Sequence, residues 1–237
     1  MMKIIQIGVS LLATLLIPAA LYVIFFLAPV EEQMGIVQKI FYMHVAAAMC
    51  MLSHYLLSGI LSSIYLFRPR PLLDGFAEAC ADTGTLFAMV VLSTGPLWAR
   101  KAWGAWWSFE PRLTLTLLVF FVFLGYGALR RFGGTDEFTR RIAASIAALS
   151  IPAIYFIRVA VELWGGHHPP NIAQSGGYIE DNPAWTWAFE LSIGGIFALG
   201  IAFTIARARI HYLNRKVEAV WREVQDQDLD LYLEESA

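Results

Sequence analysis

The feature that most constrains this chain is a series of six apolar stretches, each close to the length that crosses a bilayer. A membrane-spanning helix needs roughly 20 predominantly apolar residues. The chain has 237 residues, of which 58% are hydrophobic and only 15% are charged, and a soluble domain of this size cannot bury that much apolar surface. The sequence therefore predicts an all-α integral membrane protein with six transmembrane helices. We expect the spans near Ile4–Ala28, Met43–Phe67, Thr83–Trp98, Leu113–Leu129, Ile142–Leu163 and Trp185–Ala206.

Lysine and arginine predict the orientation, because cytoplasmic loops carry an excess of both. With the N-terminus inside, twelve of the 17 basic residues lie in cytoplasmic segments, and this arrangement places both termini in the cytoplasm. The outer segments hold four basic residues, and Arg158 lies within the fifth span. The twelve are Lys3, Arg68, Arg70, Arg130, Arg131, Arg140, Arg141, Arg207, Arg209, Arg215, Lys216 and Arg222; the four are Lys39, Arg100, Lys101 and Arg112.

The domain organisation follows from the spans. We expect residues 1–206 to form one six-helix transmembrane domain and residues 207–237 to form a cytoplasmic C-terminal tail that begins basic and ends acidic. The first span exceeds the roughly 7–15 apolar residues of a signal peptide, and no A-x-A site follows it, so we expect a retained anchor.

A tryptophan-rich stretch reads W-G-A-W-W-S-F-E-P-R over residues 103–112, in the outer loop between the third and fourth spans. If it is helical, Trp103, Trp106, Trp107 and Glu110 share one face, which forms a broad aromatic plate suited to a flat ligand such as a porphyrin. The alternative is an aromatic belt at the membrane surface. Pro96 is expected to help end the third span, and Pro111, preceded by Glu110, suits the first turn of the fourth.

Three histidines converge on the same outer face as the tryptophan stretch. His44 stands at the outer mouth of the second span, and His167 and His168 stand in the loop after the fifth. Histidine is the usual protein ligand of haem iron, and two imidazoles from separate segments can occupy both axial positions. His54 lies about 15 Å deeper than His44, at 1.5 Å per residue, so we expect a neutral, hydrogen-bonded core residue there. His211 is expected to need no special role.

Several other function classes lack their sequence features. The chain carries no nucleic-acid footprint, phosphate-binding glycine loop or nucleophile elbow. Its two cysteines, Cys50 and Cys80, are isolated, and no CxxCH haem-attachment motif is present. Any haem would therefore be held without thioether bonds to this chain.

These motifs resemble the CcmC (haem exporter protein C) family of cytochrome c biogenesis. The stretch W-G-A-W-W-S-F-E-P-R resembles the tryptophan-rich WWD signature of haem-handling proteins, and Lys39–His44 is similar to the family segment that precedes the second span. Aligning Val161, Glu162 and Trp164 with the family pattern places the second histidine on His168, with His167 as the alternative.

The chain departs from the family pattern at four positions. Phe109 and Glu110 stand where the family has tryptophan and aspartate, so the aromatic surface and the carboxylate are kept but an indole N–H donor is lost. Ala46 stands where a proline is common, and Leu163 replaces one tryptophan before the second histidine. These changes indicate a divergent member with the same function.

The resemblance implies a set of haem-binding residues. Haem b would stack non-covalently on the tryptophans, with the iron held by His44 and His168, and Arg112, with Arg100 or Lys101, would pair with the propionates. The full set is Trp103, Gly104, Trp106, Trp107, Phe109, Glu110, Arg112, His44 and His168.

The resemblance also implies a location and partners. Haem would be presented at the outer face of a bacterial inner membrane, the mitochondrial inner membrane being the less favoured alternative. It would pass to a haem chaperone of the CcmE type beside the ABC subunits CcmA and CcmB and the small subunit CcmD, with membrane lipid around the chain and no nucleic acid. The covalent chemistry would belong to the chaperone, so we do not expect an enzyme.

Two other function classes remain open alternatives. A membrane b-type cytochrome would require histidine pairs buried across facing helices, and only His54 is deep. A transporter permease would show broken helices or inverted repeats, and neither is visible in the sequence.

One ion pair is predicted from depth alone. Arg158 and Glu190 are expected about 7 Å below the outer surface on adjacent spans, at 1.5 Å per residue, and to pair in the bundle interior because an unpaired charge there is costly. Glu162, one turn above Arg158, is the competing partner.

Overall fold

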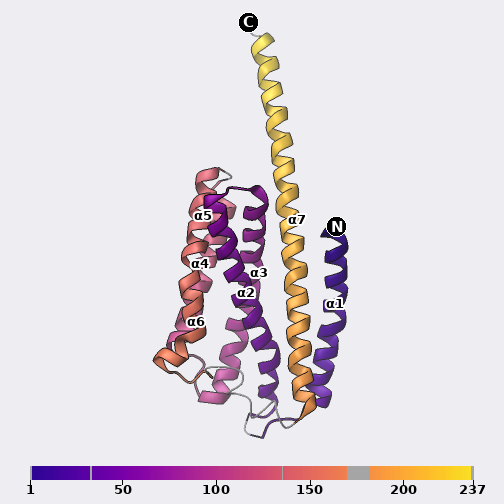
Figure 1. Cartoon of the computed structure of the whole chain (residues 1–237), viewed down its shortest axis with the longest axis vertical. Coiled ribbons are helices and arrows are strands. Elements are labelled where there is room, and N and C mark those ends of the chain that lie inside the picture. Colours follow the sequence, from indigo (N-terminus) through magenta and orange to yellow (C-terminus); the bar gives the residue numbers. More distant parts are fainter. Residues whose placement is uncertain (1, 33, 135, 170–181, 236–237) are drawn as a thin grey trace.

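The computed structural model describes residues 2–32, 34–134, 136–169 and 182–235. Within these ranges, six helical spans are long and apolar enough to cross a membrane, as the sequence predicts. Both termini lie at one end of the bundle (Figure 1), which we call the termini end. The opposite end holds the helix starts at Ile40, Pro111 and Pro183, and we call it the histidine end.

The spans pack around α2 (Ile40–Phe67), which contacts α3 (Pro71–Trp103), α5 (Glu137–Leu149), α6 (Ile151–Trp164) and α7 (Pro183–Glu235). The central contact is a stack of Tyr55 on Phe123 of α4 (Pro111–Phe132), with ring centroids 3.9 Å apart. Gly84 of α3 lies directly beneath the Tyr55 ring, where a Cβ would come within 2.6 Å. The core therefore depends on a close approach of α2 and α3 that only glycine permits.

The first span lies apart from this core and packs mainly on α7 (Figure 1). It consists of α1 (Met2–Tyr22) and a π-helical turn, η1 (Val23–Leu27). Buried Lys39, at the end of the 3₁₀ turn η2 (Ile36–Lys39), donates from Nζ to Ile24 O at 2.5 Å and to Ala28 O at 3.1 Å. These bonds satisfy carbonyls at the end of the first span and fix the entry into α2.

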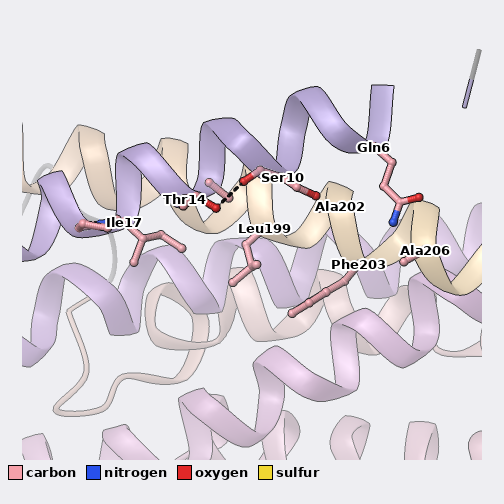
Figure 2. A pocket seen from close by; sticks show the side chains of 10 residues that line it. Gln6, Ser10, Thr14, Ile17, Leu199, Ala202, Phe203 and Ala206 are labelled. Atoms are coloured by element: carbon pink, nitrogen blue, oxygen red, sulfur yellow. Dashed lines mark hydrogen bonds between the residues drawn. The ribbon is translucent and has the colours of Figure 1, made fainter. Parts of the chain in front are cut away.

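A groove of about 470 Å³ runs between α1 and α7 (Figure 2). Small and polar side chains such as Ser10, Thr14 and Ala202 line it. It lies along the shaft of the two helices and contains none of the residues expected to bind haem.

The third span is longer at both ends than the sequence predicts. α3 begins at Pro71, because the carboxylates that interrupt its apolar run are paired rather than solvated. It also continues through Pro96 to Trp103, so the expectation that Pro96 helps end this span is wrong. Membrane helices tolerate proline where neighbouring helices and Ser or Thr side chains satisfy the freed backbone groups.

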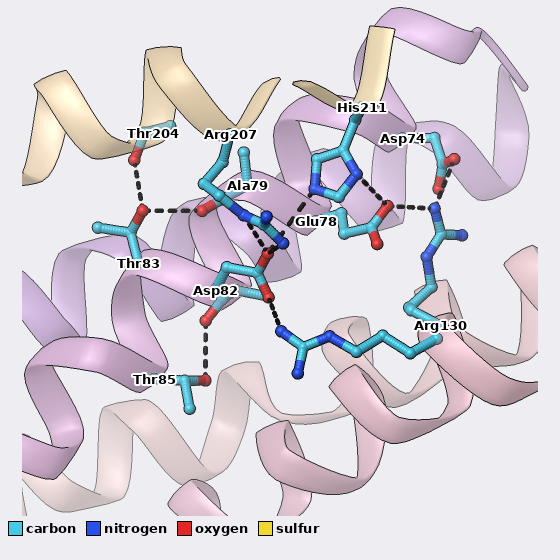
Figure 3. Close-up of polar contacts among 12 residues, drawn as sticks. Asp74, Glu78, Ala79, Asp82, Thr83, Thr85, Arg130, Thr204, Arg207 and His211 are labelled. Carbon is cyan, nitrogen blue, oxygen red and sulfur yellow. Dashed lines mark hydrogen bonds and ion pairs between the residues drawn. The ribbon is translucent and has the colours of Figure 1, made fainter. Parts of the chain in front are cut away.

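The paired carboxylates form a charge cluster at the termini end (Figure 3). Asp74, Glu78 and Asp82 lie one turn apart on α3, and Arg215, His211 and Arg207 follow the same spacing on α7. Figure 3 shows Arg207 and His211 of α7 facing the carboxylates of α3, with Arg130 of α4 beside them. His211 lies 3.4 Å from Glu78 and 3.7 Å from Asp82, so the expectation that it has no special role is wrong.

The fifth span is interrupted, which the sequence did not predict. α5 ends at Leu149 and α6 begins at Ile151, with Ser150 between them and Pro152 in the first turn of α6. Proline lacks the N–H that would continue the α5 hydrogen-bond pattern. The two helices still run in one line across the bundle (Figure 1).

α7 is continuous from Pro183 to Glu235, across the expected boundary between residues 206 and 207. Arg207, His211 and Arg215 hold it against α3, and beyond them it projects past the bundle (Figure 1).

The predicted pair of Arg158 with Glu190 is wrong. Arg158 lies 3.3 Å from Glu162, one turn along α6, and both side chains are about half exposed. Glu190 is exposed on α7. The reason is the packing order: α6 packs on α4 and α2, whereas α7 packs on α1, α3 and α2.

Candidate haem-binding site

The tryptophan stretch is not a helix, so the single face proposed for Trp103, Trp106, Trp107 and Glu110 does not form. α3 ends at Trp103, and Gly104 takes a left-handed conformation with φ +76°, which ends a helix and favours glycine. Residues 104–110 are irregular. α4 then begins at Pro111 with Glu110 as its N-cap residue, as the sequence predicts.

Trp103 is the tryptophan that the fold brings to the histidine loop. Its ring centroid lies 5.7 Å from that of His167 and 6.3 Å from that of His168. On its other side it meets Trp98 edge-on at 5.5 Å. Trp103 is half-buried, so it offers a supported aromatic surface beside both candidate ligands.

The other aromatic side chains of the stretch point elsewhere. Trp106 is 58% exposed and Phe109 is 85% exposed. Trp107 meets Phe109 edge-on with centroids 6.5 Å apart. The stretch therefore presents one packed indole and a separate set of exposed rings instead of a continuous plate.

His44 faces α3 from the start of α2. Its Nδ1 lies 2.8 Å from Thr94 Oγ1, and the Thr94 hydroxyl donates its own proton to Val90 O at 2.7 Å. Thr94 must therefore accept from Nδ1–H, which assigns the tautomer whose Nε2 carries a free lone pair. Metal-ligating histidines are commonly held in this way by a partner on the other ring nitrogen.

A short chain of contacts connects His44 to Trp103. Gly95 lies so close to His44 that a Cβ there would be 3.3 Å from Cε1. Thr94 and Trp98 are four residues apart on α3 and share a face, and Trp98 contacts Trp103. The fold thus brings His44, Trp103 and His168 to one end of the bundle.

His168 is turned inward while His167 is exposed. The Nδ1 atom of His168 lies 3.1 Å from Pro169 O, which can only accept, and a proton on Nδ1 for this contact leaves the lone pair of Nε2 for a ligand. Arg112 Nη1 lies 2.9 Å from the same Nδ1 atom. Burial lowers the pKa of His168 from its usual value, which favours the neutral imidazole that binds metals.

Two charged residues on either side of Pro111 contact the histidine loop. Glu110 is buried, and its Oε2 accepts the backbone N–H of His167 at 2.7 Å. Arg112 donates to Pro169 O at 2.7 Å as well as contacting His168. Of the other basic candidates, Arg100 donates to Gly104 O and Lys101 is exposed.

The donor set fits haem. Two imidazoles with free Nε2 atoms suit an iron with two axial positions, and an indole suits the porphyrin plane. His54 is not among these donors, because it is buried and its Nδ1 lies 2.8 Å from Cys50 O. This confirms the prediction of a hydrogen-bonded core histidine.

Several residues of the site could not be found from the sequence. Thr94, Gly95, Trp98 and Gly166 act through contacts between distant segments, and no local pattern distinguishes them. Of these four residues, only Trp98 could have been suspected from the sequence, because it is a tryptophan at the end of an expected span.

Comparisons with known proteins identify relatives of this chain. A family model described as "Heme exporter protein C" (CcmC) matches residues 1–223. A ccmC-like mitochondrial protein of cytochrome c biosynthesis from Marchantia polymorpha is 34% identical over 201 residues, covering 83% of this chain and 85% of its own length.

Two bacterial proteins named heme exporter protein C are also similar to the chain. The protein from Paracoccus denitrificans is 27% identical and covers 82% of this chain and 81% of its own length. The protein from Escherichia coli K12 is 27% identical and covers 77% and 73%. With a family match over nearly the whole chain and a relative above 30% identity, the chain belongs to the CcmC, or haem exporter protein C, family.

Proposed function

We propose that this chain binds haem b non-covalently at the histidine end, between His44 and His168 and beside Trp103. The observation that carries the proposal is the Thr94 contact, which places the ring proton of His44 on Nδ1 and leaves the lone pair of Nε2 for iron. The inward-facing His168 and the indole of Trp103 support it. Haem is the cargo in this proposal.

Family membership implies haem handling in cytochrome c maturation within a Ccm system that includes ABC-type partners. The finer proposal is that haem passes to a membrane-tethered chaperone of the CcmE type, with CcmA, CcmB and CcmD as neighbours. Exposed Trp106 and Phe109 beside the site leave room for a partner to approach the haem edge. On this proposal the chain presents haem, and bond formation takes place on the chaperone.

The histidine end is proposed to face the periplasm of a bacterial inner membrane. Its support is the distribution of basic residues, since twelve of the 17 Lys and Arg residues belong to segments at or beyond the termini end. The mitochondrial inner membrane is the alternative, because one relative is a mitochondrial protein.

An electron-transfer cytochrome is less well supported. It would need histidine pairs in the bundle interior, and deep His54 is hydrogen-bonded within its own helix. A permease is the other alternative, and the interruption at Ser150 is the one described feature that it would share.

A reduced-minus-oxidised optical spectrum tests the proposal. The protein is purified in detergent after expression with ample haem, and a b-type spectrum at about one haem per chain is expected because two imidazoles give a low-spin iron. Extraction with acidified acetone should remove all of the haem. A preparation free of haem under these conditions would reject the proposal.

A further inference from the structure

We infer that Glu110 and Arg112 form a clamp that positions the His168 loop against Trp103 and leaves the haem propionates to other groups. The inference rests on the proposed function for its haem-dependent tests, but the clamp itself is a property of the haem-free chain. It assigns these two residues a role different from the cofactor contact that the family resemblance implies.

The Glu110 half of the clamp is a buried carboxylate. Its side chain is 7% exposed, and Oε2 accepts the His167 N–H at 2.7 Å and lies 3.7 Å from His167 Nδ1. Oε1 is also buried and has no hydrogen-bond partner among the residues that the structure describes. A carboxylate buried in this way is oriented toward the loop backbone and away from solvent.

The loop backbone fits around that carboxylate. Gly166 has φ +143°, and a Cβ at this position would lie 2.7 Å from Glu110 Oε2. Gly165 also has a positive φ of +74°. Both values belong to a region that side chains rarely adopt, so the two glycines let the chain turn closely over Glu110.

The Arg112 half holds the loop from its other side and joins it to α6. The guanidinium donates to Ile157 O at 3.1 Å, to Arg158 O at 2.8 Å and to Pro169 O at 2.7 Å. Its Nη1 also lies 2.9 Å from His168 Nδ1. A guanidinium has five N–H donors, and three of those of Arg112 are directed to backbone carbonyls of α6 and the loop.

Pro111 joins the two halves. It occupies the first turn of α4 and fixes the backbone between Glu110 and Arg112. One tripeptide at the end of the tryptophan stretch therefore contacts three consecutive loop residues, His167, His168 and Pro169. This arrangement sets the distance between Trp103 and the second ligand.

The first test uses haem-free protein. Hydrogen exchange is measured by mass spectrometry on the segment 160–169 in the wild type, Glu110→Ala, Glu110→Gln and the matched control Glu162→Ala, an exposed glutamate close to the same loop. Glu110→Ala should raise exchange at His167 about tenfold or more, as expected for loss of a bond to a charged group. Glu110→Gln keeps an accepting oxygen and should stay near the wild type, as should the control.

Two results would overturn the clamp at this stage. One is unchanged exchange in Glu110→Ala, which would show that the loop does not depend on the carboxylate. The other is an increase as large in Glu110→Gln as in Glu110→Ala, which would show that charge, and not the accepted bond, is what matters.

The second test separates positioning from propionate binding. Wild-type and Arg112→Gln proteins are titrated with haem and with haem dimethyl ester, whose propionates are uncharged. A positioning role predicts that Arg112→Gln weakens both ligands by the same factor. If Arg112 pairs with a propionate, this neutral substitution should instead remove a preference of the wild type for haem over the ester, and the inference fails.

Added imidazole can replace a missing histidine ligand, and this gives a third test. In Glu110→Ala, added imidazole should restore the six-coordinate low-spin spectrum, because the displaced His168 leaves the iron with a vacant position. Failure of imidazole to do so would contradict the positioning role. A wild type that binds neither haem nor its ester would reject the proposed function, while the exchange measurement would still decide whether the clamp exists.

Discussion

Single hydrogen bonds decide which histidine nitrogens are free for a ligand. At His44 the choice is made by Thr94, whose hydroxyl is committed to Val90 O and so can only accept from Nδ1. At His168 the contact of Nδ1 with Pro169 O plays the same part, since a carbonyl can only accept. In the proposed site, residues that do not touch the iron would thus prepare both ligands.

The histidine assignment predicts unequal effects of three alanine substitutions. His44→Ala and His168→Ala should each lose most bound haem or shift its spectrum toward a weaker-field ligand set, because each removes an axial ligand. His167→Ala should have a smaller effect, since this ring is exposed. Haem content per chain and the optical spectrum measure the difference. If His167→Ala alone abolishes binding, the second ligand is His167.

The tryptophans should also differ. Trp103→Ala should weaken haem binding by a factor of about two to ten, which corresponds to the roughly 0.5–1.5 kcal/mol of an aromatic pair. Trp106→Ala should have less effect on binding, because its ring is 58% exposed, whereas Trp103 lies against both histidines. Haem titration of both variants tests this. If the two variants lose haem affinity equally, the tryptophans act together as one aromatic plate. If the variants fail to insert into the membrane, the tryptophans instead form an aromatic belt.

At the scale of elements, the antiparallel pair of α3 and α7 is held by a row of carboxylates that faces a row of two arginines with a histidine between them. The carboxylates of Asp74, Glu78 and Asp82 repeat every four residues, and so do the basic groups of α7 that face them. Arg130 of α4 joins the two carboxylates nearest the termini end, at 3.0 Å and 2.6 Å. A membrane helix can carry these charges because each of them has a partner.

Arg130→Met should strongly destabilise the protein. Its side chain is 8% exposed, so removing it leaves buried Asp74 and Glu78 with only their partners on α7, and breaking a buried ion pair costs about 3–5 kcal/mol. Combining it with Glu78→Gln should recover part of that loss. Thermal unfolding in detergent, followed by circular dichroism, measures both variants. As a control, Arg141→Met breaks an exposed pair with Glu137 and should change little.

At the scale of the whole molecule, two helices connect the charge cluster with the histidine end. α3 runs from the carboxylate cluster to Trp98 and Trp103, and α7 runs from the histidine end to the basic row and beyond (Figure 1). The charge cluster therefore holds together α3 and α7, whose opposite ends lie at the histidine end. Because Arg207, His211 and Arg215 contact α3, the turns of α7 that hold them belong to the packed bundle.

Two truncations test that assignment. A chain ending at Lys216 keeps Arg207, His211 and Arg215 and should unfold within a few degrees of the full chain. A chain ending at Ala206 removes all three and should unfold at least about 5 °C lower, at roughly 2–4 °C per kcal/mol. Equal melting temperatures would show that the tail from residue 207 is an independent appendage.

The sequence by itself determined the class of fold and the approximate spans. Hydrophobicity and charge are local properties, so six apolar runs and the placement of lysine and arginine are enough for the six spans and for termini at one end. The start of α4 at Pro111 and the buried state of His54 were predictable for the same reason. His44, His168 and the tryptophan stretch could be selected as candidates because their residue types carry the chemistry.

Only the tertiary structure decided which residues meet. It pairs Arg158 with Glu162, selects Trp103 from its neighbours, and directs Glu110 and Arg112 to the histidine loop. It also decides that α3 begins at Pro71 and not near Thr83, because the partners of the α3 carboxylates lie on α4 and α7. The physical reason is the same throughout: a contact between segments far apart in the chain depends on which helices pack together, and a local pattern does not contain that information.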